Sequence, residues 1–331
     1  GNAIPVIDLR VLEAAEKEGG ERLQEEEARL RRACEEVGFF YLVGHGVAEK
    51  LWEGAFRCAR EFFALPEEEK ELVAADENHR GFTRMLDESL DPAHQSMGDT
   101  KEGFYVGKEV PAADPRAALP LHGPNQWPAF LGADWRRTLE AYRDRLAAAA
   151  QALLPFLAGA LGLEERSYFA ESFSDPMVFV RLLHYAAVRS SPHDGVYGCG
   201  AHTDFGMLTL LATDDVPGLQ IHTDHLLDAG AARWLDVPPR PGAFIVNIGD
   251  MLERWSNGIF KSTRHRVVNM EGRERYSIPF FFEPNFDTRV ECLPCCCSEE
   301  RPPRYAPTTS GKHLLEKYAE TSQAFVAAAA Q

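Results

Sequence analysis

The chain has 331 residues, of which 45% are hydrophobic and 26% charged, an ordinary globular composition with enough apolar material for a core. Its formal net charge is −16, from 35 basic and 51 acidic residues, which argues against nucleic acid and anionic membranes as partners. No apolar run approaches the length of a membrane span, and the first residues lack the order of a signal peptide. We therefore expect a soluble, cytoplasmic protein.

The first part of the chain predicts helices around two short strands. One strand is expected over residues 4–9, and a second at Phe39–Val43, where aromatic and branched residues gather. Between them, apolar residues at helical spacing predict an amphipathic helix over residues 21–37, which Gly38 ends. A further helix is predicted over residues 48–64.

An acidic run and a long irregular stretch follow. The run Glu67–Lys70 predicts a solvated helical turn rather than a site. Residues 76–133 are rich in Gly, Pro and Asp and show little periodicity, which is typical of a functional lid or wall. Residues 135–163, rich in Ala and Leu, predict a long helix.

The pattern then changes to short strands. Apolar runs at residues 178–183, 208–211, 244–247 and 275–282 alternate with Gly, Pro and Asp turns. Many short strands at regular spacing predict a β-sandwich or barrel.

We expect one domain, 1–331, of the α+β class with a mainly β core. Residues 1–175 would supply flanking helices, strands and a lid, and residues 176–285 the β core. Residues 286–331 would form a loop and a closing helix over residues 310–330.

The most informative motif is a spaced trio of candidate metal ligands. One residue separates His202 from Asp204, and His265 follows 61 residues after Asp204. In an extended strand, residues i and i+2 point to the same side, so the first pair can bind one ion together. Two imidazoles and one carboxylate are the ligand set of non-haem Fe(II) sites that keep positions open for oxygen and substrate. The trio therefore predicts an iron centre.

Other histidines and cysteines carry weaker signals. Four histidines lack an evident partner ligand and are expected to be structural or superficial: His184, His193, His222 and His225. A tight cysteine group lacks the second ligand pair of a zinc site and predicts an exposed, oxidisable loop; it comprises Cys292, Cys295, Cys296 and Cys297. The remaining cysteines are expected to be small buried residues: Cys34, Cys58 and Cys199.

Arg275 and Ser277 also stand two residues apart on a predicted strand, so both face one side. Ten residues separate His265 from Arg275, which predicts a hairpin whose second strand lies beside the metal strand. A buried Arg needs an anion, and its planar guanidinium grips a carboxylate with two hydrogen bonds, to which the Ser hydroxyl adds a third. An internal Asp or Glu is the competing partner.

Together these residues resemble the Fe(II)- and 2-oxoglutarate-dependent dioxygenases, in the branch of isopenicillin N synthase-like and plant hydroxylase-like enzymes. The resemblance covers nearly the whole chain. Residues 4–9, 38–47 and 247–252 are similar to segments of that branch. The metal and co-substrate motifs are matched by His202-Thr203-Asp204, His265 and Arg275-x-Ser277.

That resemblance implies a double-stranded β-helix, or jelly roll, with flanking helices. It implies that His202, Asp204 and His265 hold Fe(II), and that the distal carboxylate of 2-oxoglutarate pairs with Arg275 and Ser277. A Tyr that often hydrogen-bonds the co-substrate is matched by Tyr185, although Ala186 replaces the Pro that commonly follows it. The implied reaction uses O2, releases succinate and CO2, and hydroxylates, desaturates or cyclises a small molecule.

Candidates for the substrate pocket are aromatic. Strand alternation turns Phe281 inward, as a pocket wall or as a core residue. Phe104, Tyr105 and Phe82 are lid candidates in the irregular stretch. Three other functions stay open: a 2-oxoglutarate-independent iron oxidase of the same fold, a hydroxylase of proteins or other macromolecules, and a non-catalytic jelly-roll binding protein.

Overall fold

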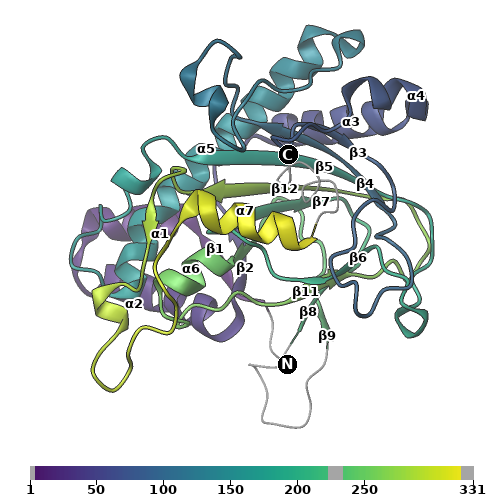
Figure 1. Ribbon diagram of the computed structural model, residues 1–331. Helices are drawn as coiled ribbons and strands as arrows, with labels where there is room; N and C mark the ends of the chain where they lie inside the picture. Colours follow the sequence, from purple (N-terminus) through teal and green to yellow (C-terminus); the bar gives the residue numbers. More distant parts are fainter. Residues whose placement is uncertain (1–3, 223–233, 322–331) are drawn as a thin grey trace.

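Two β-sheets form the centre of the protein in the computed structural model, which describes residues 4–222 and 234–321 (Figure 1). The larger sheet has eight strands, in spatial order β1 (Val6–Asp8), β2 (Phe39–Val43), β10 (Phe244–Ile248), β7 (Leu208–Thr213), β12 (Arg275–Glu283), β5 (Met177–Tyr185), β4 (Lys101–Gly107) and β3 (Gly81–Thr83). The smaller has four, in the order β6 (Cys199–His202), β11 (His265–Val267), β8 (Leu219–His222) and β9 (Trp234–Asp236). A two-stranded sheet joins β13 (Arg289–Val290) to β14 (Thr308–Thr309).

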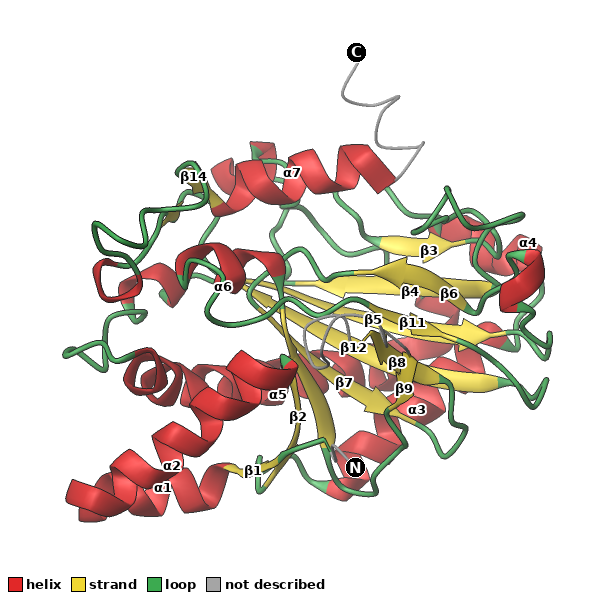
Figure 2. Ribbon diagram, turned by 90° about the horizontal axis from the view of Figure 1, so that it is seen from below, coloured by secondary structure: helices red, strands yellow, loops and turns green. Residues whose placement is uncertain are grey.

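Seven α-helices are described around these sheets: α1 (Leu9–Glu18), α2 (Gly20–Arg32), α3 (Glu49–Phe63), α4 (Glu67–Lys70), α5 (Gly132–Leu161), α6 (Asp250–Trp255) and α7 (Ser310–Thr321). Both α3 and α5 pack on the large sheet against β5 and β12, and α7 crosses in front of it in Figure 1. Figure 2 shows α3 and α5 on one side of the strands and α7 on the other. This arrangement confirms the expected jelly roll with flanking helices.

The side chains of the central strand β12 alternate between the two faces of the large sheet. Ile278, Phe280 and Phe282 belong to the main apolar core with α3 and α5 and are fully buried. The intervening residues, from Arg275 to Glu283, therefore point to the opposite face of the large sheet. There a second apolar cluster joins residues of both sheets, such as Tyr185 on β5 and Ile221 on β8. The inner face of β12 thus looks into the space between the sheets.

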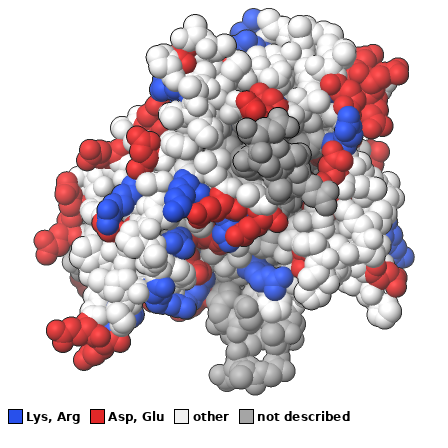
Figure 3. All heavy atoms as spheres, viewed as in Figure 1, with Lys and Arg blue, Asp and Glu red and all other residues white. Residues whose placement is uncertain are grey.

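Several local predictions are confirmed. The predicted helix over residues 21–37 is α2 followed by a π-helical turn, Ala33–Val37, and Gly38 ends it in the left-handed region at φ 72°. A side chain at Gly38 would collide with the Lys261 carbonyl, because an added Cβ would lie 2.3 Å from that oxygen. The acidic run forms α4, whose Glu67 and Glu68 are exposed, as predicted, whereas Lys70 is buried. Acidic side chains gather at the upper right of Figure 3, where α4 lies in the same view of Figure 1.

One helix was not predicted, and two predictions need correction. The helix α1 is not indicated by the sequence pattern, although Asp8 caps it by accepting a hydrogen bond from Arg10 N at 3.0 Å. The irregular stretch contains two strands, β3 and β4, which extend the large sheet. The hairpin between His265 and Arg275 is wrong: β11 pairs with β6 and β8, whereas β12 belongs to the other sheet. The connection crosses between sheets, as jelly-roll topology requires.

The closing helix agrees with its prediction over Ser310–Thr321, and the rest of its predicted range lies outside the described residues. Among the described helices, none combines the length and the apolar character needed to cross a membrane.

Candidate active site

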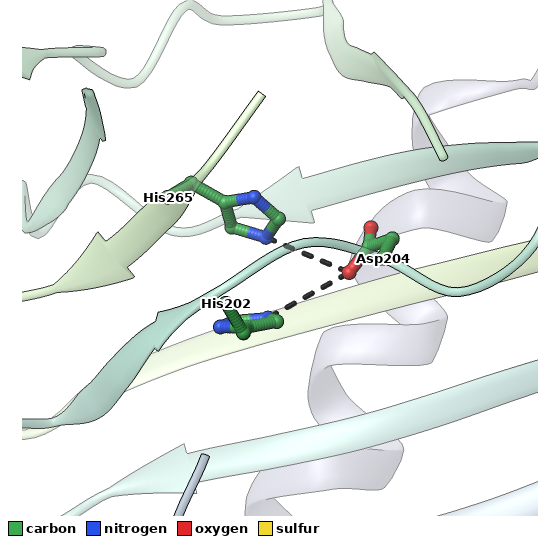
Figure 4. A group of neighbouring side chains, drawn as sticks. All are labelled: His202, Asp204 and His265. Atoms are coloured by element: carbon green, nitrogen blue, oxygen red, sulfur yellow. Dashed lines mark ion pairs between the residues drawn. The ribbon is translucent and has the colours of Figure 1, made fainter. Parts of the chain in front are cut away.

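Strand pairing brings the three candidate metal ligands together. In the small sheet, β6 and β11 run antiparallel, and His202 is the direct partner of His265. Asp204 lies two residues beyond the end of β6, so its carboxylate can approach both imidazoles. Its Oδ1 lies 3.6 Å from Nε2 of His202 and 3.5 Å from Nε2 of His265 (Figure 4). These three side chains form the only group of three or more potential ligands found among the described residues.

Both imidazoles are held in the tautomer that a metal needs. Nδ1 of His202 lies 2.8 Å from the Gly200 carbonyl, and Nδ1 of His265 lies 3.1 Å from the Thr263 carbonyl. A carbonyl only accepts hydrogen bonds, so each Nδ1 must carry the proton. The Nε2 lone pairs are then free on the side where Asp204 lies, which is the donor set expected for Fe(II).

The carboxylate of Asp204 is oriented by two donors. Asn247 Nδ2 on β10 donates to its Oδ2 at 2.7 Å, and the Thr209 hydroxyl on β7 donates to the same oxygen. Burial alone would raise the pKa of Asp204, but without a metal the imidazoles of His265 and His202, in their protonated form, and the Thr209 hydroxyl hold it below its ordinary value. The charged carboxylate is thus the stable form, with Oδ1 left for a metal.

Arg275 provides an anion site of the kind expected for a co-substrate. It opens β12, opposite Tyr185 on β5, and is 1% exposed. Its Nε donates to the Val216 carbonyl at 3.2 Å, its guanidinium lies 4.8 Å from the Tyr185 ring centre, and its Nη1 has no hydrogen-bond partner among the described residues. No ion pair joins it to an acid within the described ranges, so an internal acid as its partner lacks support. Ser277, 1% exposed, lies on the same face.

A cavity of about 540 Å3 opens beside the trio, lined by His202 and Asp204 among others. Phe82, Tyr105 and Phe281 also line it. Phe104 does not: it lies on the opposite face of β4, where its ring contacts Phe62 at 4.5 Å between centres. The structure therefore separates Phe104 from the other pocket candidates, because consecutive strand residues face opposite ways.

Sequence reasoning missed the charged residues of the cavity wall. Arg181 on β5 lines the cavity and pairs with Glu88 at 2.8 Å, and Glu88 also lies 3.0 Å from Lys101. Lys101 also pairs with Asp99, whose Oδ1 accepts from Gly200 N at 2.8 Å. This buried network connects the cavity wall to the strand that ends in His202. A charged residue inside a mostly apolar strand is the sequence feature that could have identified Arg181.

Glu283 was also missed. It is the last residue of β12, is 3% exposed and lines the cavity. Burial and the nearby Asp204 charge raise the pKa of Glu283 to about 8, although Met207 N donates to its carboxyl at 2.7 Å. The alternation that turns Phe281 inward also places Glu283 on that face, so a signal for this residue exists in the sequence.

The weaker candidates stand apart from the site. His184 bonds to Glu102 at 2.8 Å, the His193 side chain is 97% exposed, and the His222 ring packs on Trp234 at 4.8 Å. His225 lies outside the described residues. Cys34, Cys58 and Cys199 are buried as predicted. The cysteine group is only partly superficial, because Cys296 is buried while Cys295 is exposed.

Comparison with known proteins agrees with this geometry. Residues 4–130 match the family described as non-haem dioxygenase in morphine synthesis N-terminal, and residues 176–284 match the 2OG-Fe(II) oxygenase superfamily. The chain is 40% identical to the 2-oxoglutarate-Fe(II) type oxidoreductase hxnY of Emericella nidulans, over 85% of this chain and 80% of that protein. It is 35% identical to azadirone synthase of Melia azedarach, over 98% and 96% of the two chains.

A solved structure is similar over almost the whole length. A full-length Neurospora crassa protein, crystallised in complex with alpha-KG and thymine, is 30% identical, with a TM-score of 0.81 and 96% of each chain covered. The families that match, the relatives and the fold agree on one assignment. This chain belongs to the 2-oxoglutarate- and Fe(II)-dependent oxygenases.

Proposed function

We propose that the protein oxidises a C–H bond of a small molecule, most simply by hydroxylation, and converts 2-oxoglutarate to succinate and CO2. The convergence of His202, Asp204 and His265 on one point beside a cavity carries this proposal. The three side chains would hold Fe(II) through two Nε2 atoms and one carboxylate oxygen. Bound Fe(II) would supply oxygen activation, and the chain supplies binding, orientation and a site sheltered from water.

The co-substrate site rests on Arg275. Its unpartnered Nη1 and the neighbouring Ser277 hydroxyl would bind the distal carboxylate of 2-oxoglutarate. Tyr185 would form one wall of this site, because its ring already lies against the guanidinium. A buried guanidinium that forms no ion pair within the described part of the chain favours a 2-oxoglutarate-dependent oxygenase over an oxidase that needs no such co-substrate. The unbroken metal trio argues against a binding protein without catalysis.

A small substrate fits the cavity better than a macromolecule. Its volume of about 540 Å3 lies within the range of roughly 300–1,000 Å3 that is usual for small-molecule sites. Phe82, Tyr105 and Phe281 would form apolar walls for the substrate. We also propose a single oxygenase domain, because one apolar core contains residues from Ile7 to Leu314.

Succinate formation tests the proposal. Purified protein with Fe(II) and 2-oxoglutarate should form succinate in the presence of O2, faster when a substrate from a metabolite library is added. Asp204→Ala should abolish both rates, whereas Asp215→Ala, at a side chain 89% exposed, should leave them unchanged. Succinate formation by Asp204→Ala at the wild-type rate would show that the iron site is misassigned.

A further inference from the structure

We propose that Glu283 recognises the substrate by accepting a hydrogen bond from one of its N–H groups, and that the site therefore selects nitrogen compounds and rejects carboxylates. This inference rests on the proposed function, because it assigns the substrate end of the same cavity. It concerns a residue outside the metal and co-substrate motifs.

The position of Glu283 supports this role. It follows Arg275 by eight positions on β12, so both point to the same face of the large sheet. Phe281 lies between them on that face, and Phe281, Glu283 and Asp204 all line the cavity. The co-substrate end and the substrate end of the site would thus lie along one strand.

The chain makes room for this carboxyl group beside the metal ligands. Gly206 follows Asp204 by two residues, and a Cβ added there would lie 1.7 Å from Oε2 of Glu283. Any side chain at position 206 would displace the acid from its present place. The acid at position 283 and the glycine at position 206 therefore fit together as a pair.

The acid lacks a balancing charge. Its one hydrogen bond within the described residues comes from Met207 N, at 2.7 Å, and no Lys, Arg or His there forms an ion pair with it. A single backbone donor leaves most of the hydrogen-bonding capacity of a carboxyl group unused. A role limited to holding Met207 N would need only one neutral acceptor, and a buried acid without a partner is unfavourable. A ligand that brings an N–H donor meets this need.

The surrounding charges favour such a donor over an anion. Arg181, a buried cation of the cavity wall, is already paired with Glu88, and Arg84 is paired with Glu71. Three further acids line the cavity and form no ion pair with a described residue: Asp76, Glu77 and Asp87. An anionic substrate would therefore meet these acids, and each of the two arginines is already paired with an acid. A planar ring carrying N–H groups could also lie against Phe281.

Four probe compounds test whether the N–H group that Glu283 accepts from is neutral or cationic. Thymine offers neutral N–H groups, and agmatine offers cationic ones. 1,3-Dimethylthymine has the thymine ring without N–H, and benzoate is a flat anion. Binding is measured by calorimetry to the full chain loaded with 2-oxoglutarate and with Mn(II) in place of Fe(II), so that affinity is read without turnover.

We expect thymine or agmatine to bind, with dimethylthymine and benzoate weaker by about tenfold, as for the loss of one hydrogen bond to the carboxyl group. Glu283→Leu should weaken the bound nitrogen probe by about tenfold or more while 2-oxoglutarate affinity stays unchanged, which also shows that the variant is folded. Glu283→Gln keeps an acceptor for Met207 N; it should spare thymine but weaken agmatine by about tenfold. Glu291→Gln, at a side chain 50% exposed, is the matched control.

Three results would overturn the inference: tight binding of dimethylthymine or benzoate, nitrogen-probe binding that Glu283→Leu leaves unchanged, or no binding of either nitrogen probe. Failure of the wild-type protein to bind 2-oxoglutarate or the metal is a different result. It would count against the proposed function itself.

Discussion

Replacing Arg275 with Met should weaken 2-oxoglutarate binding while leaving the ligand-free protein at least as stable as the wild type. These two effects have opposite signs because the guanidinium has no internal acid partner among the described residues. It is 1% exposed, its Nη1 is unpartnered, and its described hydrogen bond is from Nε to the Val216 carbonyl. Met has a similar length and can keep the contact with the Tyr185 ring.

The expected magnitudes follow from these contacts. A guanidinium that grips a carboxylate makes two charge-assisted hydrogen bonds, each worth about 1.5–3 kcal/mol. Losing both corresponds to binding weaker by roughly a hundredfold to a thousandfold or more. Removing a buried charge that lacks a partner should stabilise the ligand-free protein by up to about 3 kcal/mol. Arg275→Lys keeps the charge but loses the fork, so its affinity should fall between the two.

Calorimetry with Mn(II) measures the affinity for 2-oxoglutarate, and thermal unfolding without ligand measures the stability. The reasoning fails if Arg275→Met binds 2-oxoglutarate as tightly as the wild type, because the anion would then bind elsewhere. A drop of several degrees in the Tm of ligand-free Arg275→Met would show that Arg275 holds the fold together, as an internal ion pair would.

Three further changes test the site. Asp204→Ala should remove metal binding, measured by equilibrium dialysis with Co(II), while circular dichroism remains that of the wild type. Asn247→Leu removes a hydrogen bond to Asp204 and should lower metal affinity by about 10- to 100-fold; unchanged affinity would mean that Asp204 needs no such support. Folding raises the pKa of Glu283 from 4.5 to about 8. The free energy of unfolding of the wild-type protein should therefore fall as the pH rises between these two values, by about 1.4 kcal/mol for each pH unit. Urea unfolding of metal-free Glu283→Gln should show a smaller fall, and an identical pH profile would contradict the assignment.

The sequence predicts this site because its main signals are local. His202 and Asp204 stand only two residues apart, and the period-two rule places Arg275, Ser277 and Phe281 together without knowledge of the fold. The same rule places Glu283 on this face as well, provided that the predicted strand is extended to that residue. The period-two rule cannot identify the strand with which each element pairs. For that reason the spacing predicts a hairpin of His265 with Arg275, whereas His265 pairs with His202 in the other sheet.

The strand β4 shows why the irregular stretch gives no strand signal. Lys101–Gly107 carries two charges and two glycines, a composition that does not indicate a strand, yet every residue in it is buried. Its charges are satisfied by residues distant in the sequence or in the neighbouring loop: Lys101 by Glu88 and Asp99, and Glu102 by His184. Gly103 is required because a Cβ there would lie 2.8 Å from Nε of Arg181. Such partners belong to tertiary structure and leave no local pattern.

Buried charges in this protein fall into two groups, and the difference between them locates the ligands. Arg181 and Lys101 are both paired with Glu88, which balances their charges within the protein. Arg275 and Glu283 are buried but have no ion-pair partner among the described residues, and both lie on the inner face of β12. Arg80 is also buried without an ion pair among the described residues, but it donates to the carbonyls of Asn78 and Leu121. An unpaired cation and an unpaired acid on a single strand face are suited to ligands of complementary charge or polarity. The strand β12 would then order the site from the anion of the co-substrate at Arg275 to the donor group of the substrate at Glu283.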